Sequence, residues 1–121
     1  MLSSDIYPAI DYHLSTQTDG TVVLELSGDL DLATAPILEA ALRQATSEPP
    51  RLLVIDLRAV TFLDSSGVLL LIQVCKRQKA ADQGLRMVLA PWQSAYRVLA
   101  LSGLMQLTGI EWDTGTGSEP R

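Results

Sequence analysis

The chain has 121 residues, of which 47% are hydrophobic and 19% are charged, and its formal net charge is −5. This length suits one compact domain with a core, and the composition argues against disorder over most of the chain. The negative charge would repel a phosphate backbone, and the one small basic cluster, Lys76, Arg77 and Lys79, does not compensate for it. Nucleic-acid binding is therefore not expected.

Cys75 is the only cysteine, which excludes an intramolecular disulfide and a cysteine-based metal cage. The opening residues 1–8 lack a basic segment that leads into an apolar one, and the apolar run 68–75 is far shorter than the roughly 20 residues of a membrane helix. We therefore expect a cytoplasmic protein without a membrane segment. The lone His13 has no His or Cys partner nearby, so neither a zinc site nor a cofactor is expected.

Two extended segments, 13–18 and 21–27, open the domain. The dipeptide Asp19-Gly20 between them tolerates the positive φ angles of a tight turn, so the two segments should form a hairpin. Val22, Leu24 and Leu26 share one side of the second segment, which predicts a buried face.

A helix should follow, because Thr34 can cap it, Pro36 fits its first turn and apolar residues recur at helical spacing up to about Thr46. Pro49-Pro50 ends this helix. The uninterrupted apolar run 52–55 then predicts a central strand covered on both faces. A helix between two strands favours a parallel crossover.

This third strand should continue to a corner at Asp64-Ser65. Apolar residues surround most of the segment from Gly67 to about Ala81, so we expect a helix that is buried along much of its circumference and is terminated by Gly84.

Residues 85–90 predict another strand, and a third helix should begin at Pro91 or Ser94 and end at Gly103. A last short strand is expected within 106–112. The domain should therefore span residues 1–112, with a flexible tail at 113–121 that is rich in Gly, Thr and Ser. The order β-β-α-β-α-β-α-β predicts an α/β fold with a mixed sheet of four to five strands packed with three or more helices.

The stretch Asp64-Ser65-Ser66-Gly67 links a buried strand to a helix. Taken alone, it is explained by a helix cap, because Asp and Ser are favoured at that position. A serine there would also lie beside free N–H groups of the helix N-terminus, which can accommodate a phosphate. A second polar cluster, Gly28-Asp29-Leu30-Asp31, ends another predicted strand, and the two ends can form one surface.

An enzyme is not expected. A serine hydrolase needs a base against the hydroxyl of Ser65 or Ser66, and the only histidine, His13, lies in the predicted N-terminal strand. The chain also lacks a Gly-x-Ser-x-Gly elbow and a Gly-rich nucleotide loop.

The chain resembles the STAS domain, the fold of bacterial anti-anti-sigma factors. The motif Asp-Ser-Ser-Gly is short by itself, but several matching segments follow one another in the family's order and span most of residues 13–112. These segments are Leu26-Ser27-Gly28-Asp29-Leu30-Asp31 with Thr34-Ala35, then Val54-Ile55-Asp56-Leu57, then residues 60–67, and finally Leu101-Ser102-Gly103-Leu104.

The resemblance implies an anti-sigma factor antagonist that binds an anti-sigma factor serine kinase when unphosphorylated and is released when phosphorylated, so regulating sigma-factor-dependent transcription. It implies that Ser65 is the phosphorylated residue, that Ser66 is a cap or hydrogen-bonding support, and that a serine phosphatase removes the phosphate. The partner-binding residues so implied are Asp29, Asp31, Thr34, Asp64, Ser65, Ser66 and Gly67.

Alternatives stay open at this point. Asp64 could serve only as a helix cap, the modified serine could be Ser66, and Asp56 is better explained by bonds to nearby backbone donors than by partner contact. The protein could also be a STAS scaffold or sensor module in another phosphorelay, or a STAS domain that binds a small ligand. A weak homodimer is compatible with all of these readings.

Overall fold

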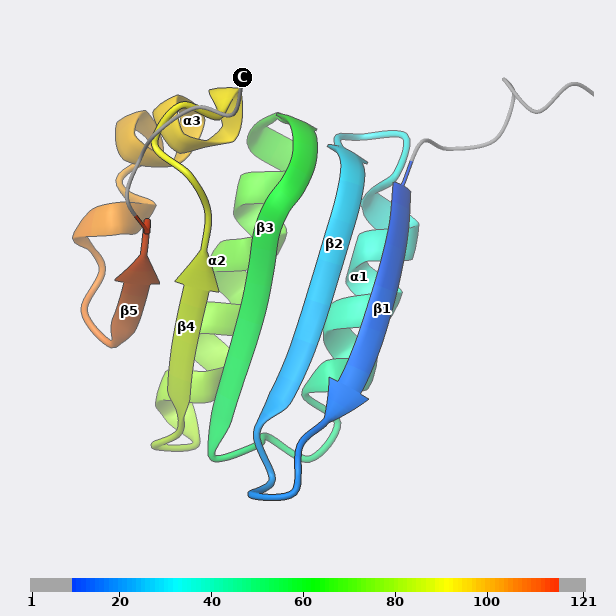
Figure 1. Ribbon diagram of the computed structural model, residues 1–121, viewed down its shortest axis with the longest axis vertical. Coiled ribbons are helices and arrows are strands. Elements are labelled where there is room, and N and C mark those ends of the chain that lie inside the picture. Colours follow the sequence, from blue (N-terminus) through cyan, green and yellow to red (C-terminus); the bar gives the residue numbers. More distant parts are fainter. Residues whose placement is uncertain (1–9, 116–121) are drawn as a thin grey trace, which may run out of the picture.

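The secondary-structure elements follow the predicted order. The computed structural model describes residues 10–115, and within them a short 3-10 helix, η2, is the one addition to the expected elements. The elements, shown in Figure 1, are β1 Ile10–Thr16, β2 Val22–Leu30, α1 Ala35–Ala45, β3 Leu52–Leu63, α2 Ser65–Ala80, β4 Gly84–Val88, α3 Ser94–Ser102, η2 Leu104–Gln106 and β5 Ile110–Asp113.

The five strands form one mixed sheet in the order β1-β2-β3-β4-β5. β1 and β2 form the predicted antiparallel hairpin, in which Gly20 takes a φ of +88°. The other neighbouring strands are parallel and are connected through α1, α2 and α3 in turn. The α/β fold class and the mixed sheet are therefore confirmed.

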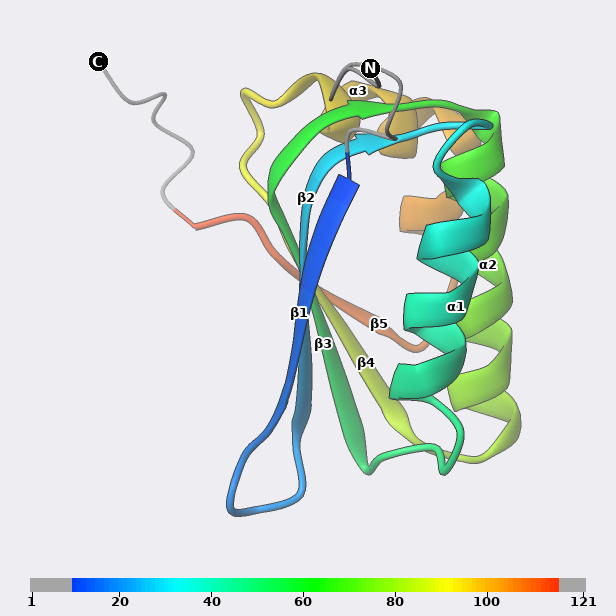
Figure 2. The ribbon, with the colours of Figure 1, turned by 90° about the vertical axis from the view of Figure 1, so that its right-hand side faces the viewer.

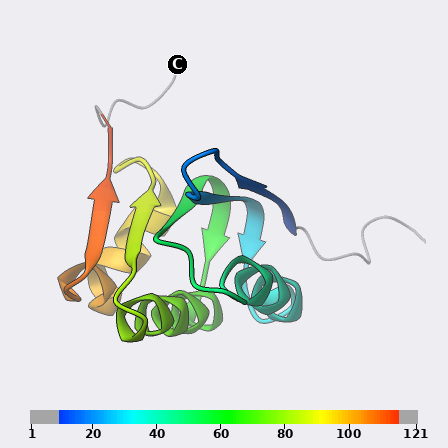
Figure 3. The ribbon, with the colours of Figure 1, turned by 90° about the horizontal axis from the view of Figure 1, so that it is seen from below.

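The helices leave one face of this sheet open. α1 and α2 lie side by side on the same face, and α3 lies at the end where β2 and β3 finish (Figures 2 and 3). From β2 to β5, each parallel strand lies next to the one before it, always toward the same edge of the sheet. Connections between parallel strands are right-handed, so the helices in these connections lie on the same face.

The expectation that β3 is covered on both faces is therefore wrong. Leu53 and Ile55 are buried beneath the helices, whereas Leu52 and Val54 are only half-buried on the opposite face. No element of residues 10–115 packs over that face.

α2 buries one side, not most of its circumference. Val68, Leu71 and Val74 face the sheet, whereas Leu70 and Ile72 are only half-buried. The sequence-based expectation fails because α2 belongs to an outer layer, so its far side meets solvent. In the part of the chain that the structure describes, no helix is both long and apolar enough to cross a membrane.

The helix ends follow the predictions in part. α2 is capped by Ala81 and followed by Asp82 at a φ of +56°, so Gly84 does not terminate it and instead begins β4. A short Asp side chain tolerates this left-handed conformation better than most residues. α3 ends at Gly103 as predicted, with a φ of +87°.

Asp113, which the sequence assigned to the tail, belongs to the sheet. Asp113 is the last residue of β5, and its carbonyl accepts a hydrogen bond from the N–H of Leu89 at 3.1 Å. Most of the remaining tail, residues 116–121, lies outside the described residues.

β3 carries the chain from the sheet to the start of α2. Residues Leu53–Asp56 pair with both β2 and β4, whereas the part of β3 beyond Asp56 pairs with β2 alone. The register with β2 shifts twice, and each shift places one extra residue on β3. Bulges of this kind bend a strand, and Figure 2 shows β3 curving over the core toward α2.

A side chain replaces the missing strand partner beyond Asp56. Gln93, in the loop between β4 and α3, donates from Nε2 to the carbonyls of Leu57 and Val60 at 2.9 and 3.2 Å. Its Oε1 accepts the N–H of Ala90 at 2.6 Å. Gln93 thereby satisfies two carbonyls of the bent part of β3, which buried backbone groups require.

Candidate functional site

Ser65 is the first residue of α2, and it is exposed. The residue before it, Asp64, is the helix cap: its Oδ1 accepts the N–H groups of Ser66 at 2.8 Å and Gly67 at 3.3 Å. Ser66 is therefore not the cap. The expectation of free N–H groups beside Ser65 is wrong for these two, because the Asp64 carboxylate already occupies them.

The two predicted strand ends meet. Leu30 of β2 pairs with Leu63 of β3, and the N–H of Asp64 donates to the carbonyl of Leu30 at 3.1 Å. The second carboxylate oxygen of Asp64 accepts the N–H of Leu32 at 3.3 Å. The polar clusters that the sequence placed at residues 28–31 and 64–67 therefore lie side by side.

The loop between β2 and α1 is held by reciprocal hydrogen bonds. The N–H of Asp31 donates to Oγ1 of Thr34, and the N–H of Thr34 donates to Oδ1 of Asp31, both at 3.0 Å. The Thr34 hydroxyl also donates to the carbonyl of Asp29 at 2.7 Å. Thr34 is only 1% exposed, so it shapes the loop from below and offers no side chain to a partner.

Gly67 is also buried, and the packing around it leaves no room for a side chain. A Cβ at this position would lie 2.6 Å from Cδ1 of Leu63 and 2.8 Å from the carbonyl oxygen of Leu30. Gly67 therefore lets α2 approach the ends of β2 and β3 closely, which brings Ser65 next to the β2–α1 loop.

The remaining predicted residues are accessible to different degrees. Ser65 is exposed, whereas Asp29, Asp31, Asp64 and Ser66 are half-buried. The Asp29 carboxylate is engaged by the hydroxyl of Thr61 at 2.8 Å. A partner could therefore touch Ser65 directly and the three aspartates at their edges.

Sequence reasoning missed three exposed apolar side chains near Ser65: Leu32, Phe62 and Leu69. The hydrophobic pattern placed residues 62 and 69 in largely buried elements, and its failure has two structural causes. The second register shift on β3 leaves both Thr61 and Phe62 exposed, and Leu69 lies on the solvent side of α2. For Leu32, an apolar residue within a polar loop was the available signal.

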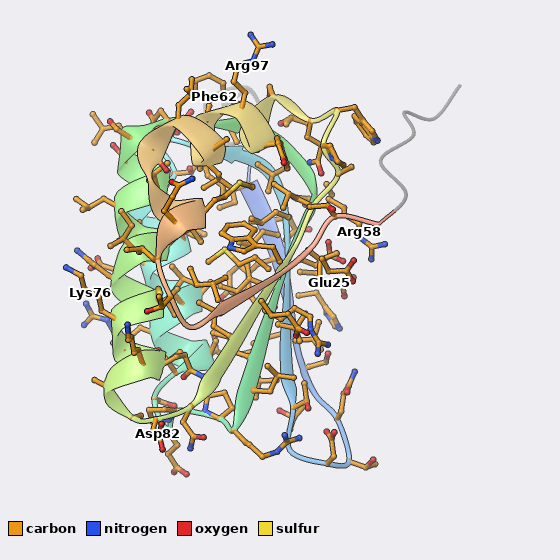
Figure 4. All side chains as sticks on the ribbon, turned by 90° about the vertical axis from the view of Figure 1, so that its left-hand side faces the viewer. Glu25, Arg58, Phe62, Lys76, Asp82 and Arg97 are labelled. Atoms are coloured by element: carbon orange, nitrogen blue, oxygen red, sulfur yellow. The ribbon has the colours of Figure 1, made fainter. Side chains whose placement is uncertain are left out.

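Asp56 is engaged on the open face of the sheet, as its proposed structural role requires. Its carboxylate accepts the N–H of Arg58 at 3.0 Å and the guanidinium Nη2 at 2.7 Å. Burial acts to raise the pKa of Asp56, but the hydrogen bonds and charge of Arg58 outweigh it, so the pKa lies below its ordinary value. Figure 4 shows Arg58 and Glu25 on this face, away from Phe62.

Candidate metal ligands do not gather in the described part of the chain. Residues 10–115 contain no group of three or more His, Cys, Asp or Glu side chains placed to hold a metal ion. His13 is exposed on β1.

Residues 12–112 match the profile of the STAS domain. The chain belongs to the STAS domain family. The matched range includes both strand ends and all of α2, so Ser65 and the β2–α1 loop are parts of the STAS domain itself.

Two mycobacterial relatives of this STAS protein carry antagonist names. It is 45% identical over 53 residues to the anti-sigma-F factor antagonist RsfB of Mycobacterium tuberculosis, an alignment that covers 44% of this chain and less than half, 43%, of that protein. It also resembles the crystal structure of an anti-sigma factor antagonist from Mycobacterium paratuberculosis, with 29% identity, a TM-score of 0.70 and coverage of 92% of this chain and 90% of that one.

A more distant structure shows the same fold. The Bacillus cell fate determinant SpoIIAA in its phosphorylated form is 24% identical, with a TM-score of 0.63 over 86% of this chain and 92% of that one. At this level of identity the likeness concerns the fold alone.

Proposed function

We propose that this STAS protein is an anti-sigma factor antagonist, that it binds an anti-sigma factor kinase through the surface around Ser65, and that phosphorylation of Ser65 ends this binding. The observation that carries the proposal is an exposed serine at the first position of α2, next to the β2–α1 loop. The names of the two mycobacterial relatives support the antagonist role.

The chemistry belongs to the kinase. The γ-phosphoryl group of ATP is transferred to Oγ of Ser65, the hydroxyl proton passes to a base of the kinase, and ADP leaves. A serine phosphatase reverses the modification by hydrolysis, which releases inorganic phosphate and restores the hydroxyl. Exposure of Ser65 gives both enzymes access to it.

The phosphate would leave the fold of the free protein intact. It adds about −1.5 to −2 charge at pH 7, which the positive end of α2 stabilises. However, Asp64 already accepts the N–H groups of Ser66 and Gly67, so the new charge lies beside an existing carboxylate. The phosphate is therefore best accommodated in solvent, not drawn into the helix end.

Binding is affected more strongly than stability. A partner that covers Ser65 would have to remove water from the phosphate, and desolvation of an unpaired charge costs several kcal/mol. The neighbouring Asp29, Asp31 and Asp64 cannot pair with it. One hydroxyl thus controls association while the fold is kept.

The test is phosphorylation in vitro. The protein is incubated with ATP and each anti-sigma factor kinase of its own organism, and the phosphate is located by mass spectrometry. We expect it on Ser65 and expect Ser65→Ala to abolish it. Two controls, Ser66→Ala and Ser94→Ala, should be phosphorylated normally, and Ser94 is a matched control because it is also exposed and also begins a helix.

A binding titration completes the test. Ser65→Ala should retain the affinity of the wild type for the kinase, whereas Ser65→Asp should bind more weakly. Equal affinities of Ser65→Asp and wild type would contradict the switch and would favour a scaffold. A phosphate found on Ser66 would contradict the assignment of the site.

A further inference from the structure

Exposed apolar side chains concentrate around Ser65. Six large apolar side chains are exposed within residues 10–115. Three of them lie near the point where the ends of β2 and β3 meet α2, with exposed fractions of 75% for Leu32, 49% for Phe62 and 56% for Leu69. Single exposed leucines are common on protein surfaces, whereas their gathering around one residue marks an interaction site.

Leu32 is held outward on a fixed loop. Its own N–H donates to Oδ2 of Asp64, and the Asp31–Thr34 bonds close the loop on both sides of it. The loop therefore needs little ordering when a partner binds. A side chain that is already fixed in its bound position loses less entropy on binding.

Phe62 and Leu69 owe their exposure to the same structural features that place Ser65. The second register shift of β3 exposes Phe62, and Figure 4 shows this residue at the end of the molecule. Leu69 follows Ser65 by four residues on α2, so the two side chains lie on neighbouring turns of one helix face. Val68 and Leu71 make the core contacts of that segment instead.

The charge around these side chains is mainly negative. Asp29, Asp31 and Asp64 lie where the ends of β2 and β3 meet α2, and the basic Arg97 of α3 lies at the same end of the molecule as Phe62 (Figure 4). A partner with positive charge at its rim would complement this surface, because complementary potentials select the partner and speed its association.

We infer that Leu32, Phe62 and Leu69 are the apolar anchors of the partner interface, and that the partner is a protein surface with an apolar centre and a basic rim. This inference rests on the proposed function and names the chemistry of its partner. The anchors supply affinity by burial of apolar area, and Ser65 lies among them, where water is excluded on docking. The same exclusion of water makes a phosphate on Ser65 incompatible with the complex.

The test compares exposed apolar side chains at two places on the molecule. Leu32→Ser, Leu69→Ser and Phe62→Ser are titrated with the kinase that phosphorylates Ser65, beside Leu107→Ser as a matched control. Leu107 is 40% exposed but follows η2, in the segment that leads to the edge strand β5. Each of the four side chains is exposed, so all variants should keep the melting temperature and circular dichroism spectrum of the wild type.

We expect each anchor variant to weaken binding by about tenfold or more, and Leu107→Ser to bind like the wild type. Raising the salt concentration should weaken wild-type binding because the rim charges are screened. If all three anchor variants bind the kinase as tightly as the wild type does, the inference is overturned while the proposed function stands. If the salt concentration does not change the affinity of the wild type, the inferred basic rim of the partner is overturned.

Two other outcomes separate the inference from the proposed function. If the wild type neither binds any anti-sigma factor kinase nor is phosphorylated by one, the proposed function is wrong, and the inference that rests on it is wrong as well. If the wild type alone sediments as a dimer that Leu32→Ser converts to a monomer, a second copy of the chain occupies the anchors, which overturns the inferred partner.

Discussion

Two helices of this protein begin in the same way in sequence and differently in structure. α2 and α3 each open with an exposed serine, Ser65 and Ser94. Before Ser65, the Asp64 carboxylate bonds two helix N–H groups at the surface. Before Ser94, the Gln93 side chain makes no cap bond and is directed into the core, where it bonds carbonyls of β3.

The third residue of each helix differs as well. In α2 it is Gly67, and the helix approaches Leu30 and Leu63 so closely that no Cβ fits. In α3 it is the half-buried Tyr96. The start of α2 is thus tightly packed where two strand ends and a loop meet. At the start of α3, by contrast, the Gln93 side chain supplies hydrogen bonds to the bent end of β3. Ser65 and Ser94 occupy the same position in their helices, so the difference between them lies in their surroundings. Only Ser65 adjoins the ends of β2 and β3 and the β2–α1 loop, which makes it the candidate phosphorylation site.

The largest effect on stability is expected for substitution of Gln93, before α3. Gln93→Ala leaves the buried carbonyls of Leu57 and Val60 without their donor, and each unsatisfied buried group costs about 1–3 kcal/mol. We expect the free energy of unfolding, measured by urea denaturation, to fall by about 3 kcal/mol. The control Gln73→Ala, at an exposed position of α2, should change it little, and a similarly small loss for Gln93→Ala would remove the contrast between the two helix starts.

The next effect tests the close approach of α2. Gly67→Ala places a Cβ against Leu63 and Leu30, and overpacking costs about 1–3 kcal/mol even though alanine favours the helix. We expect a loss of about 2 kcal/mol in urea denaturation, with Ser66→Ala as the neighbouring control. Unchanged or increased stability of Gly67→Ala would mean that the corner is packed more loosely than these distances indicate.

Removal of the cap should have a smaller effect. Asp64→Ala deletes the acceptor for the N–H groups of Ser66, Gly67 and Leu32, and loss of an N-cap side chain costs about 1 kcal/mol. Asp64→Asn keeps a neutral acceptor and should recover most of this loss. Thermal unfolding of the three proteins gives the comparison, and equal melting temperatures would show that the cap contributes nothing to stability.

The smallest effects should come from the two serines. Ser65→Ala and Ser94→Ala remove exposed hydroxyls, so each should change the free energy of unfolding by less than about 0.5 kcal/mol. The variants should instead differ in phosphorylation, which Ser65→Ala alone abolishes. A loss above about 1 kcal/mol for Ser65→Ala would indicate a structural role for this hydroxyl, since surface changes away from special features rarely cost so much.

The sequence was sufficient for the elements whose signals are local. Asp19-Gly20 predicted the hairpin, Pro36 and Thr46 bracketed α1, and Gly103 ended α3, because turn and cap residues act on backbone only a few positions away. The ordered motifs from Leu26 to Leu104 identified the STAS family on the same basis.

Burial on the second face of an element was predicted poorly. The apolar run of β3 and the apolar circumference of α2 both indicated cover on two sides, yet the right-handed crossovers place both α1 and α2 on one face of the sheet. A hydrophobic pattern says which residues prefer burial, but how many layers a domain has depends on the connection of strands far apart in the chain.

Sequence alone determined the order of the elements and the family, because these depend on residue types and their spacing, and the family resemblance pointed to Ser65 as the serine to test. Only the tertiary structure decided that Asp64 occupies the N–H groups beside that serine, that Thr34 and Gly67 act from below the surface, and that Leu32, Phe62 and Leu69 adjoin it. The physical reason is that these features arise where the ends of β2 and β3 meet α2, and such contacts join residues more than 30 positions apart, which no local pattern encodes.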